Sequence, residues 1–109
     1  MKLALVTGSA IGIGASIIKE LAKEGYNCVI NYHTSKEQAL FLKQEVEEKY
    51  NIKCLALQAD ISNEEEVNRM FLEIEKEFGG EVYPFSAIDN RYNGKILEKF
   101  MSYNCLDMQ

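Results

Sequence analysis

Histidine, proline, tryptophan and cysteine are scarce in this sequence, and each scarcity excludes a class of protein. The 109 residues include one proline and no tryptophan, and 47% are apolar, so we expect a packed core and not a disordered chain. Cys28, Cys54 and Cys105 lack the spacing of metal-binding or redox motifs. One histidine, His33, and scattered cysteines supply neither a Ser-His-Asp arrangement nor a metal-ligand cluster. We therefore expect no metal site.

Basic charge and long apolar runs are also lacking. Lysine and arginine number 12 against 17 acidic residues, and the net charge of −5 excludes a nucleic-acid-binding surface. No segment approaches the roughly 20 apolar residues that a membrane span needs. Residues 1–6 are too short for a signal-peptide core, and Cys28 and Cys54 in apolar runs indicate a reducing compartment. We expect a soluble, cytoplasmic protein with no membrane or nucleic-acid partner.

Apolar segments of two different periodicities alternate along the chain. Strands are predicted at residues 3–7, 28–30, 52–57 and 82–87, although Pro84 weakens the last. Helices are predicted at residues 13–24, after Ser35, after Ser62 and, more briefly, at 96–101. This alternation predicts an α/β fold: a three-layer, Rossmann-like half with a parallel sheet of about four strands, in the order 3-2-1-4, and helices on both faces.

Local signals place the ends of the predicted helices. Gly25 is expected to end the first helix. Ser35 with Gln38, and Ser62 with Glu65, have the spacing of a capping box at the start of the second and third helices. The third helix has the clearest apolar stripe in the chain, which we interpret as core packing: Val67, Met70, Phe71, Ile74 and Phe78.

A glycine-rich turn follows the first predicted strand and opens the first predicted helix. It reads Thr7-Gly8-Ser9-Ala10-Ile11-Gly12-Ile13-Gly14. Gly8 permits a sharp turn, Gly12 lets the backbone approach a pyrophosphate, and Gly14 lets helix and strand pack closely. The free N–H groups and the positive dipole end of the helix favour phosphates. The motif predicts nucleotide binding, with a tight turn that binds no ligand as the alternative.

This motif resembles the cofactor fingerprint of the short-chain dehydrogenase/reductase family. Residues 1–80 are similar to that family throughout, most of all to 3-oxoacyl-acyl-carrier-protein reductases and glucose dehydrogenases. The segment Gln58-Ala59-Asp60-Ile61-Ser62 is similar to the family's adenine-binding segment. The resemblance implies that Asp60 contacts the adenine amino group beside the Ile61 backbone. A solvated loop carboxylate is the alternative for Asp60.

The second strand bears on the choice of cofactor. NAD sites carry an Asp or Glu about 20 residues past the glycines, which would repel a 2′-phosphate. Here the strand ends Ile30-Asn31-Tyr32 without an acid, while Thr34, Ser35, Lys36 and His33 offer donors or positive charge, so we predict NADP(H) over NAD(H). An ordinary helix start would also explain Thr34-Ser35-Lys36. The expected cofactor-binding residues are Gly8, Ser9, Ile11, Gly12, Ile13, Gly14, Asn31, Tyr32, His33, Thr34, Asp60 and Ile61.

The family's catalytic residues are missing from this sequence. The resemblance implies that a Ser and a Tyr-x-x-x-Lys would stand past Gln109, where the Lys cation lowers the pKa of the Tyr and the Ser polarises a carbonyl. Tyr32 and Lys36 have this spacing, but Tyr32 ends a strand and Lys36 starts a helix, so we assign them no catalytic role. No catalytic residue is predicted.

Residues 81–109 do not resemble the family. We expect one domain over residues 1–109, in which 81–109 supply a fourth strand and a terminal helix through natural divergence, a fragment junction or a chimera. Two functions stay open. The chain is either the NADP(H)-binding part of a carbonyl reductase that is inactive alone, or a non-catalytic scaffold with a relic nucleotide site. The second would form a homodimer through an exposed sheet edge or helices.

Overall fold

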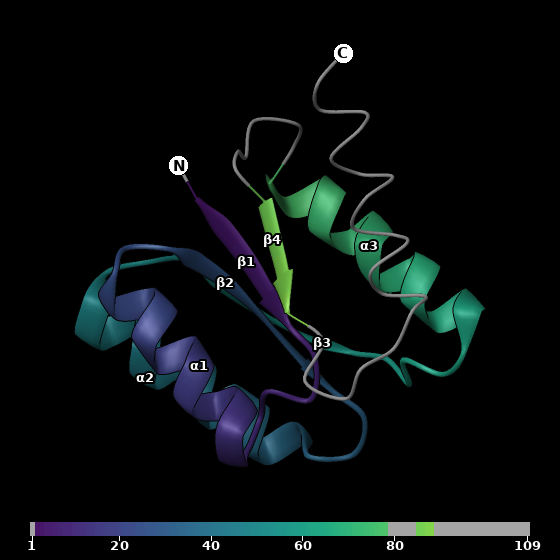
Figure 1. Cartoon of the computed structure of the whole chain (residues 1–109), viewed down its shortest axis with the longest axis horizontal. Helices are drawn as coiled ribbons and strands as arrows, with labels where there is room; N and C mark the ends of the chain where they lie inside the picture. Colours follow the sequence, from purple (N-terminus) through teal and green to yellow (C-terminus); the bar gives the residue numbers. More distant parts are fainter. Residues whose placement is uncertain (1, 79–84, 89–109) are drawn as a thin grey trace.

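Strands and helices alternate along the chain in the order that the sequence predicts. The computed structural model describes residues 2–78 and 85–88 (Figure 1). Its elements are β1 (Leu3–Val6), α1 (Gly12–Lys23), β2 (Asn27–Tyr32), α2 (Lys36–Tyr50), β3 (Cys54–Gln58), α3 (Glu64–Phe78) and β4 (Phe85–Ile88). Gly79 and Gly80, Pro84 and the helix predicted at residues 96–101 lie outside the described residues.

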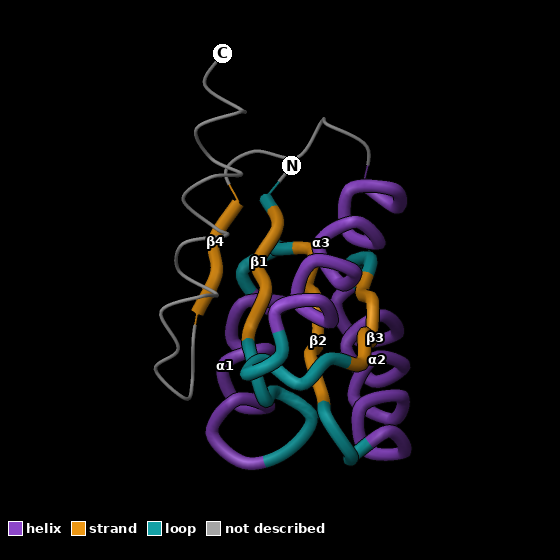
Figure 2. Tube along the Cα trace, turned by 90° about the vertical axis from the view of Figure 1, so that its right-hand side faces the viewer, coloured by secondary structure: helices purple, strands orange, loops and turns teal. Residues whose placement is uncertain are grey.

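The strands form one parallel sheet in the order β3-β2-β1-β4. In the register, Leu5 pairs with Val29 of β2 on one side and with Ala87 of β4 on the other. Helices α1 and α2 lie together on one face, and α3 lies on the opposite face (Figures 1 and 2). The predicted Rossmann-like fold class is confirmed, and the observed strand order is the predicted one.

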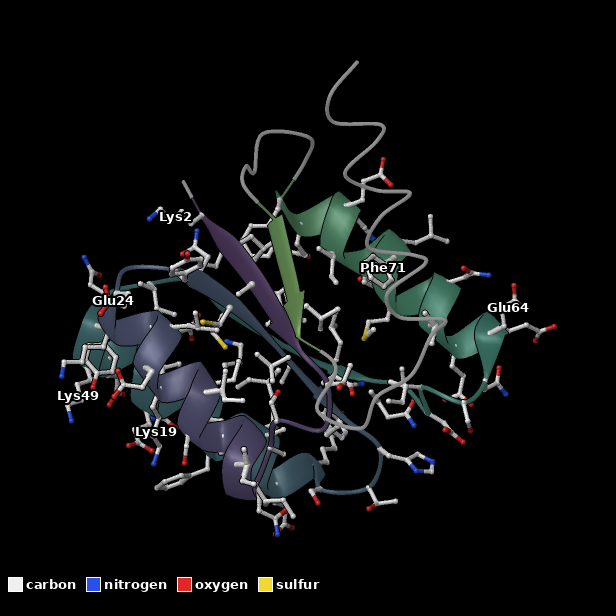
Figure 3. All side chains as sticks on the ribbon, in the orientation of Figure 1. Lys2, Lys19, Glu24, Lys49, Glu64 and Phe71 are labelled. Carbon is white, nitrogen blue, oxygen red and sulfur yellow. The ribbon has the colours of Figure 1, made fainter. Side chains whose placement is uncertain are left out.

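Each face of the sheet carries its own apolar core, because successive side chains of a strand point to opposite faces. Leu3, Leu5 and Val29 pack against the side chains of α3. Val6 and Ile30 pack in the second cluster with side chains of α1 and α2. Figure 3 shows the contrast: the labelled Lys19, Glu24, Lys49 and Glu64 lie at the periphery, whereas Phe71, which is 2% exposed, belongs to the core under α3. Burial on both faces explains the wholly apolar sequence of β1 and the apolar centre of β2.

One predicted helix end is confirmed. Gly25 follows α1 with a φ of 92°, in the left-handed region, and its N–H donates to the Ala22 carbonyl at 3.0 Å. The next amide, of Tyr26, donates to the Leu21 carbonyl, also at 3.0 Å. These bonds satisfy carbonyls that the end of a helix leaves without partners, so glycine at this position stops α1 as expected.

Both predicted capping boxes are wrong. Ser35 stands at the N-cap of α2, but its side chain makes no capping hydrogen bond. At α3 the capping residue is Asn63, whose Oδ1 accepts the Glu66 N–H at 3.2 Å. The hydroxyl of Ser62 donates instead to Asp60 Oδ1 at 2.6 Å. Ser62 thus directs its side chain to the Asp60 carboxylate and closes the preceding turn, and the side chain that accepts a helix N–H belongs to the next residue, Asn63.

Gly14 is the point of closest approach between α1 and the turn that precedes it. A Cβ at this position would lie 2.6 Å from the Gly8 carbonyl oxygen and 2.7 Å from Ser9 Cα. Both neighbours are backbone, so neither can rotate away. The expected close approach at this glycine is present, but the neighbour of the helix is the turn after β1 and not the strand itself.

Replacing Gly14 with alanine is expected to destabilise the fold. The added methyl group has to displace backbone, so we expect Gly14→Ala to lower the free energy of unfolding by about 2 kcal/mol. Glu20→Ala, at an exposed position of the same helix, is the matched control and should change it by less than about 0.5 kcal/mol. Urea unfolding followed by circular dichroism measures both. Equal stabilities of the two variants would contradict the close approach.

Glu47 connects α2 to the start of β3. Its Oε2 accepts the Cys54 N–H at 3.0 Å, and its Oε1 lies 2.9 Å from Lys43 Nζ. Partial burial raises the pKa of Glu47, but the hydrogen bond from Cys54 and the charge and bond of Lys43 outweigh it and hold the pKa below the ordinary value of 4.5. The ionised carboxylate therefore stabilises the folded state.

The contribution of Glu47 should depend on pH. Because the folded pKa lies below the unfolded one, the stabilisation is present above the unfolded value and is lost as the pH falls through the folded value. With a side chain that is 32% exposed, Glu47→Gln should cost about 1 kcal/mol at pH 7 after allowance for solvent screening. Urea unfolding near pH 3 should show a much smaller difference. Glu48→Gln, exposed on the same helix, serves as the control and should have little effect at either pH.

Candidate functional site

The N-terminus of α1 has no side-chain cap. The helix begins directly after Ile11, whose side chain makes no capping bond, and no acidic residue stands in its first turn. Gly8 and Gly12 have φ values of 56° and 62°, which favour glycine. A Cβ at Gly12 would meet no protein atom within 4 Å. Open space beside bare helix N–H groups is a suitable place for an anion.

Asn31, at the carboxyl end of β2, holds this turn against its neighbours. Its side chain is 2% exposed, and its Oδ1 accepts the Gly8 N–H at 3.0 Å. Its Nδ2 donates to the Ala59 carbonyl at 3.1 Å and lies 3.7 Å from the Met70 sulfur. One buried amide thus links the turn after β1, the end of β2, the loop after β3 and helix α3.

Ser9 completes the same network. Its N–H donates to the Asn31 carbonyl at 2.9 Å, and its hydroxyl donates to the Val6 carbonyl at 2.7 Å. The hydroxyl oxygen also accepts the Asn31 N–H at 3.2 Å. Ser9 is fully buried. Asn31 and Ser9, both expected among the cofactor-binding residues, therefore direct their side chains into the protein and position the backbone of the glycine turn.

Removing the Asn31 amide should loosen the turn. Asn31→Ala leaves the Gly8 N–H and the Ala59 carbonyl without partners, so we expect a loss of about 3 kcal/mol in the free energy of unfolding. Amide hydrogen exchange at Gly8 should accelerate as well. Asn27→Ala is the control, because Asn27 lies at the other end of β2 and its Oδ1 accepts the Lys53 N–H at 2.8 Å. Asn27→Ala should accelerate amide exchange at Lys53 and not at Gly8. Faster exchange at Gly8 in Asn27→Ala but not in Asn31→Ala would contradict this role of Asn31.

A small pocket opens between the glycine turn and the end of β2. Its volume is about 170 Å³, and it is lined by Gly8, Ala10, Ile11, Tyr32, His33, Thr34 and Ser35. Five of the predicted site residues therefore meet here. Because the Ser35 hydroxyl makes no capping bond to α2, the rim of the pocket offers hydroxyl groups as well as backbone.

The remaining predicted residues lie in three different settings. Asp60 lies near the pocket, with Oδ2 4.0 Å from His33 Nε2. Ile61 is 1% exposed and packs in the core under α3, so only its backbone faces the loop. Ile13 is 73% exposed on the first turn of α1, beside Gly12 and Gly14. Glu66 is a further residue of this region that was not predicted; its Oε1 accepts the Asp60 N–H at 3.1 Å. Its place among many glutamates gave no signal.

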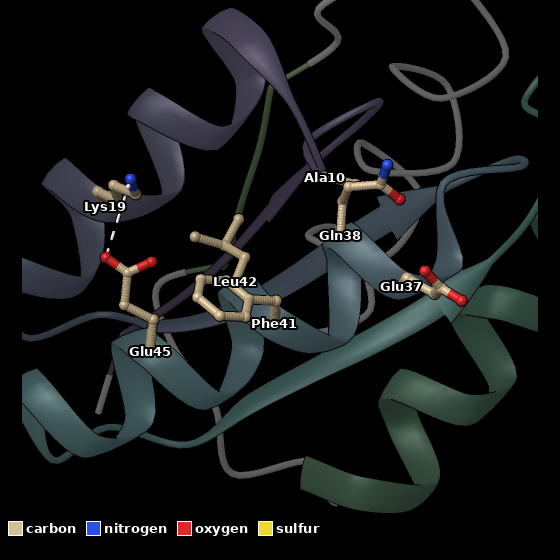
Figure 4. Close-up of a pocket in the computed structure, with 7 residues that line it drawn as sticks. All are labelled: Ala10, Lys19, Glu37, Gln38, Phe41, Leu42 and Glu45. Atoms are coloured by element: carbon tan, nitrogen blue, oxygen red, sulfur yellow. Dashed lines mark ion pairs between the residues drawn. The ribbon is translucent and has the colours of Figure 1, made fainter.

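A larger cavity, of about 450 Å³, lies elsewhere, between α1 and α2 (Figure 4). Its lining includes the exposed ring of Phe41 and an ion pair between Lys19 Nζ and Glu45 Oε2 at 3.8 Å. Apart from Ala10 it shares no residue with the pocket at the glycine turn. Size therefore does not identify the site here. The smaller pocket reaches the N-cap of α1, Ile11, and has the convergent polar groups.

Other reactive side chains of the described chain are not arranged for chemistry. Burial raises the pKa of Cys28 to about 12, and burial together with the neighbouring Cys28 raises the pKa of Cys54. Such thiols remain protonated. Tyr32 ends β2 and Lys36 begins α2, as predicted. In residues 2–78 and 85–88 no cluster of three potential metal ligands occurs, and no helix has the length and apolar character for a membrane crossing.

Comparison with known proteins identifies the family. The sequence profile of the short chain dehydrogenases matches residues 2–83. This chain belongs to the short-chain dehydrogenase family. It is 44% identical over 78 residues to 3-oxoacyl-[acyl-carrier-protein] reductase FabG of Staphylococcus aureus, a match that covers 72% of this chain and 31% of the relative. It is equally identical, over 79 residues, to the short chain dehydrogenase mdpC of Emericella nidulans, covering 72% and 29%.

Solved structures of this family have the same arrangement of elements. L-sorbose reductase of Gluconobacter frateurii, solved with NADPH and L-sorbose, superposes with a TM-score of 0.68 at 29% identity, over 72% of this chain and 30% of the reductase. The alcohol dehydrogenase of Thermococcus sibiricus, in complex with 5-hydroxy-NADP, gives 0.68 at 26% identity, over 72% and 33%. The chain thus spans about a third of the length of the proteins it matches.

Proposed function

We propose that this chain is the NADP(H)-binding portion of a short-chain oxidoreductase that reduces a carbonyl group. The observation that carries the proposal is the uncapped N-terminus of α1, open at Gly12 and held beside the pocket by Asn31. Relatives in the same family were solved with NADPH or an NADP derivative. Residues 1–109 would form one cofactor-binding unit.

The pyrophosphate would lie against the first turn of α1. Gly12 and the amides that follow it supply donors without a side chain in the way. Ile11 and Ile13, both exposed on this turn, would cover the dinucleotide. Asp60 would accept a hydrogen bond from the adenine amino group, and the Ile61 backbone would lie beside it.

The pocket at the end of β2 would take the adenosine ribose and its 2′-phosphate. The residues that line this pocket include no carboxylate, so none of them holds a 2′-hydroxyl as in NAD sites. Thr34 and Ser35 supply hydroxyl donors, and His33 supplies an imidazole. We therefore propose NADP(H) as the preferred cofactor.

Hydride transfer requires more than the cofactor site. The nicotinamide supplies the hydride, and a proton donor has to reach the carbonyl oxygen. The 109 residues contain Tyr32 and Lys36 as their one Tyr-x-x-x-Lys spacing, and these residues belong to different elements. We propose that the chain binds the cofactor but does not reduce a carbonyl by itself. A 3-oxoacyl thioester is the proposed substrate of the complete catalytic unit, on the likeness to the staphylococcal reductase.

The open space at Gly12 gives a sharp test of cofactor binding. Gly12→Ala should weaken NADPH binding more than tenfold, because the new methyl group occupies the space proposed for the pyrophosphate. Gly25→Ala is the matched control: Gly25 also has a positive φ and also has no atom within 4 Å, but it lies at the other end of α1. Each variant should lose about 1 kcal/mol of stability from backbone strain. Nicotinamide fluorescence measures the affinity.

Two results would overturn the proposal. Failure of the unaltered chain to bind NADPH at millimolar concentration would remove the cofactor site. Reduction of a ketone by the pure chain, checked by intact mass, would remove the claim that it is inactive alone.

A dimerising module with a relic site is the second candidate. Within the described residues, β3 and β4 are the outermost strands, and no strand pairs with their outer sides. Phe41 and Leu72 are also exposed, at 72% and 65%. Unpaired strands and apolar patches favour association. Light scattering would show a dimer that does not respond to cofactor, whereas a monomer that binds NADPH would exclude this candidate.

A further inference from the structure

Two side chains from neighbouring strand ends meet at the rim of the glycine-turn pocket. His33 follows β2 and lines the pocket, and its Nε2 lies 4.0 Å from Asp60 Oδ2, in the loop after β3. The other carboxylate oxygen of Asp60 accepts two hydrogen bonds from Ser62, from the N–H at 3.0 Å and from the hydroxyl at 2.6 Å. Asp60 is thus oriented from one side, and its second oxygen faces the imidazole.

The backbone under both side chains is fixed as well. The Ala59 N–H donates to the Tyr32 carbonyl at 2.9 Å, and Gln58 Nε2 lies 3.4 Å from the His33 carbonyl oxygen. The Asp60 N–H donates to Glu66 of α3 at 3.1 Å. These hydrogen bonds fix the backbone of His33, of Asp60 and of the residues just before them. The short distance between the two side chains therefore follows from how the ends of β2 and β3 are held together.

Resting on the proposed dinucleotide site, we propose that Asp60 positions His33 and that the charge of His33 sets the preference between NADP(H) and NAD(H). A protonated imidazole has two N–H donors, so it can serve Asp60 with Nε2 and a 2′-phosphate with Nδ1. A neutral imidazole has one. When its N–H donates to Asp60, the other ring nitrogen presents a lone pair to the phosphate. When its N–H donates to the phosphate, the other nitrogen presents a lone pair to Asp60. The neutral form therefore cannot satisfy both partners.

Within the described residues, charged groups near His33 come from the loop after β3, from α2 and from α3. Asp60 faces the ring, Lys36 and Glu37 with opposite charges begin α2, and Glu66 of α3 is bonded to the Asp60 backbone. Histidine changes charge between about pH 5 and 8. A phosphate monoester also titrates, near pH 6, and becomes less anionic as the pH falls. Titration of the phosphate affects the unaltered chain and the His33 variants alike. The effect of His33 is therefore the difference in affinity between these proteins for the same cofactor.

The test compares dissociation constants for NADPH and NADH between about pH 5.5 and 8.5. As the pH falls, the ratio in favour of NADPH should rise about fivefold more in the unaltered chain than in His33→Gln. His33→Lys should keep the preference at high pH, because lysine stays charged. Asp60→Asn keeps an oxygen for Ser62 but removes the charge that faces the ring, so the pH-dependent part of the ratio should shrink. A weaker interaction with adenine in this variant would affect both cofactors equally.

A second readout follows from the composition. The chain has one histidine, so its imidazole gives a single set of ring resonances in NMR. Saturation with NADPH should raise the pH at which these resonances titrate, and saturation with NADH should not. Thermal unfolding should show the variants to be folded, because His33 is 54% exposed.

The outcomes separate this inference from the function on which it rests. Binding of both cofactors with the same pH dependence in the unaltered chain and in His33→Gln would overturn the inference alone, as would equal shifts of the resonances with NADPH and NADH. Absence of binding by either cofactor at every pH would overturn the proposed function together with it.

Discussion

The buried amide of Asn31 is the constraint on which the site depends. A side chain that is 2% exposed needs partners for its donors and its acceptor, and the Gly8 N–H and the Ala59 carbonyl supply them. Both partners belong to segments that follow other strands. By satisfying its own polar groups, Asn31 fixes how the glycine turn and the Asp60 loop lie relative to β2. The pocket is the space that this arrangement leaves.

The distribution of acidic residues is compatible with an anion at the N-terminus of α1. The chain carries a net charge of −5, which by itself disfavours a phosphate ligand. Yet the first turn of α1 has no acidic residue, whereas the first turn of α3 has Glu64, Glu65 and Glu66. Asp60, the carboxylate near the pocket, is bonded to Ser62 and faces His33. Within the described residues, acidic side chains thus gather in the first turn of α3 and are absent from the first turn of α1.

Local patterns in the sequence were enough to predict the main elements and their order. The apolar runs of β1 and β2, the stripe of α3 and the stop at Gly25 depend on residues near one another, and the structure has them within a few positions of the prediction. Helix starts were less predictable. The spacing of Ser62 and Glu65 indicated a cap, but Asp60 takes the Ser62 hydroxyl and Asn63 caps α3. The Ser62 side chain could accept from a helix amide or donate to a neighbouring carboxylate, and the spacing of the sequence does not show which it does.

The sequence by itself determined the strand–turn–helix at Gly8, Gly12 and Gly14, because glycine is favoured where φ is positive, as at Gly8 and Gly12, and is needed where backbones touch, as at Gly14. It also determined the family, through motifs that lie close together in the chain. Only the tertiary structure decided that Asn31 is a buried positioning residue and that His33 meets Asp60. His33 and Asp60, distant in the chain, come together because parallel strands end at one edge of the sheet. Which side chains face each other at that edge depends on the register between β2 and β3.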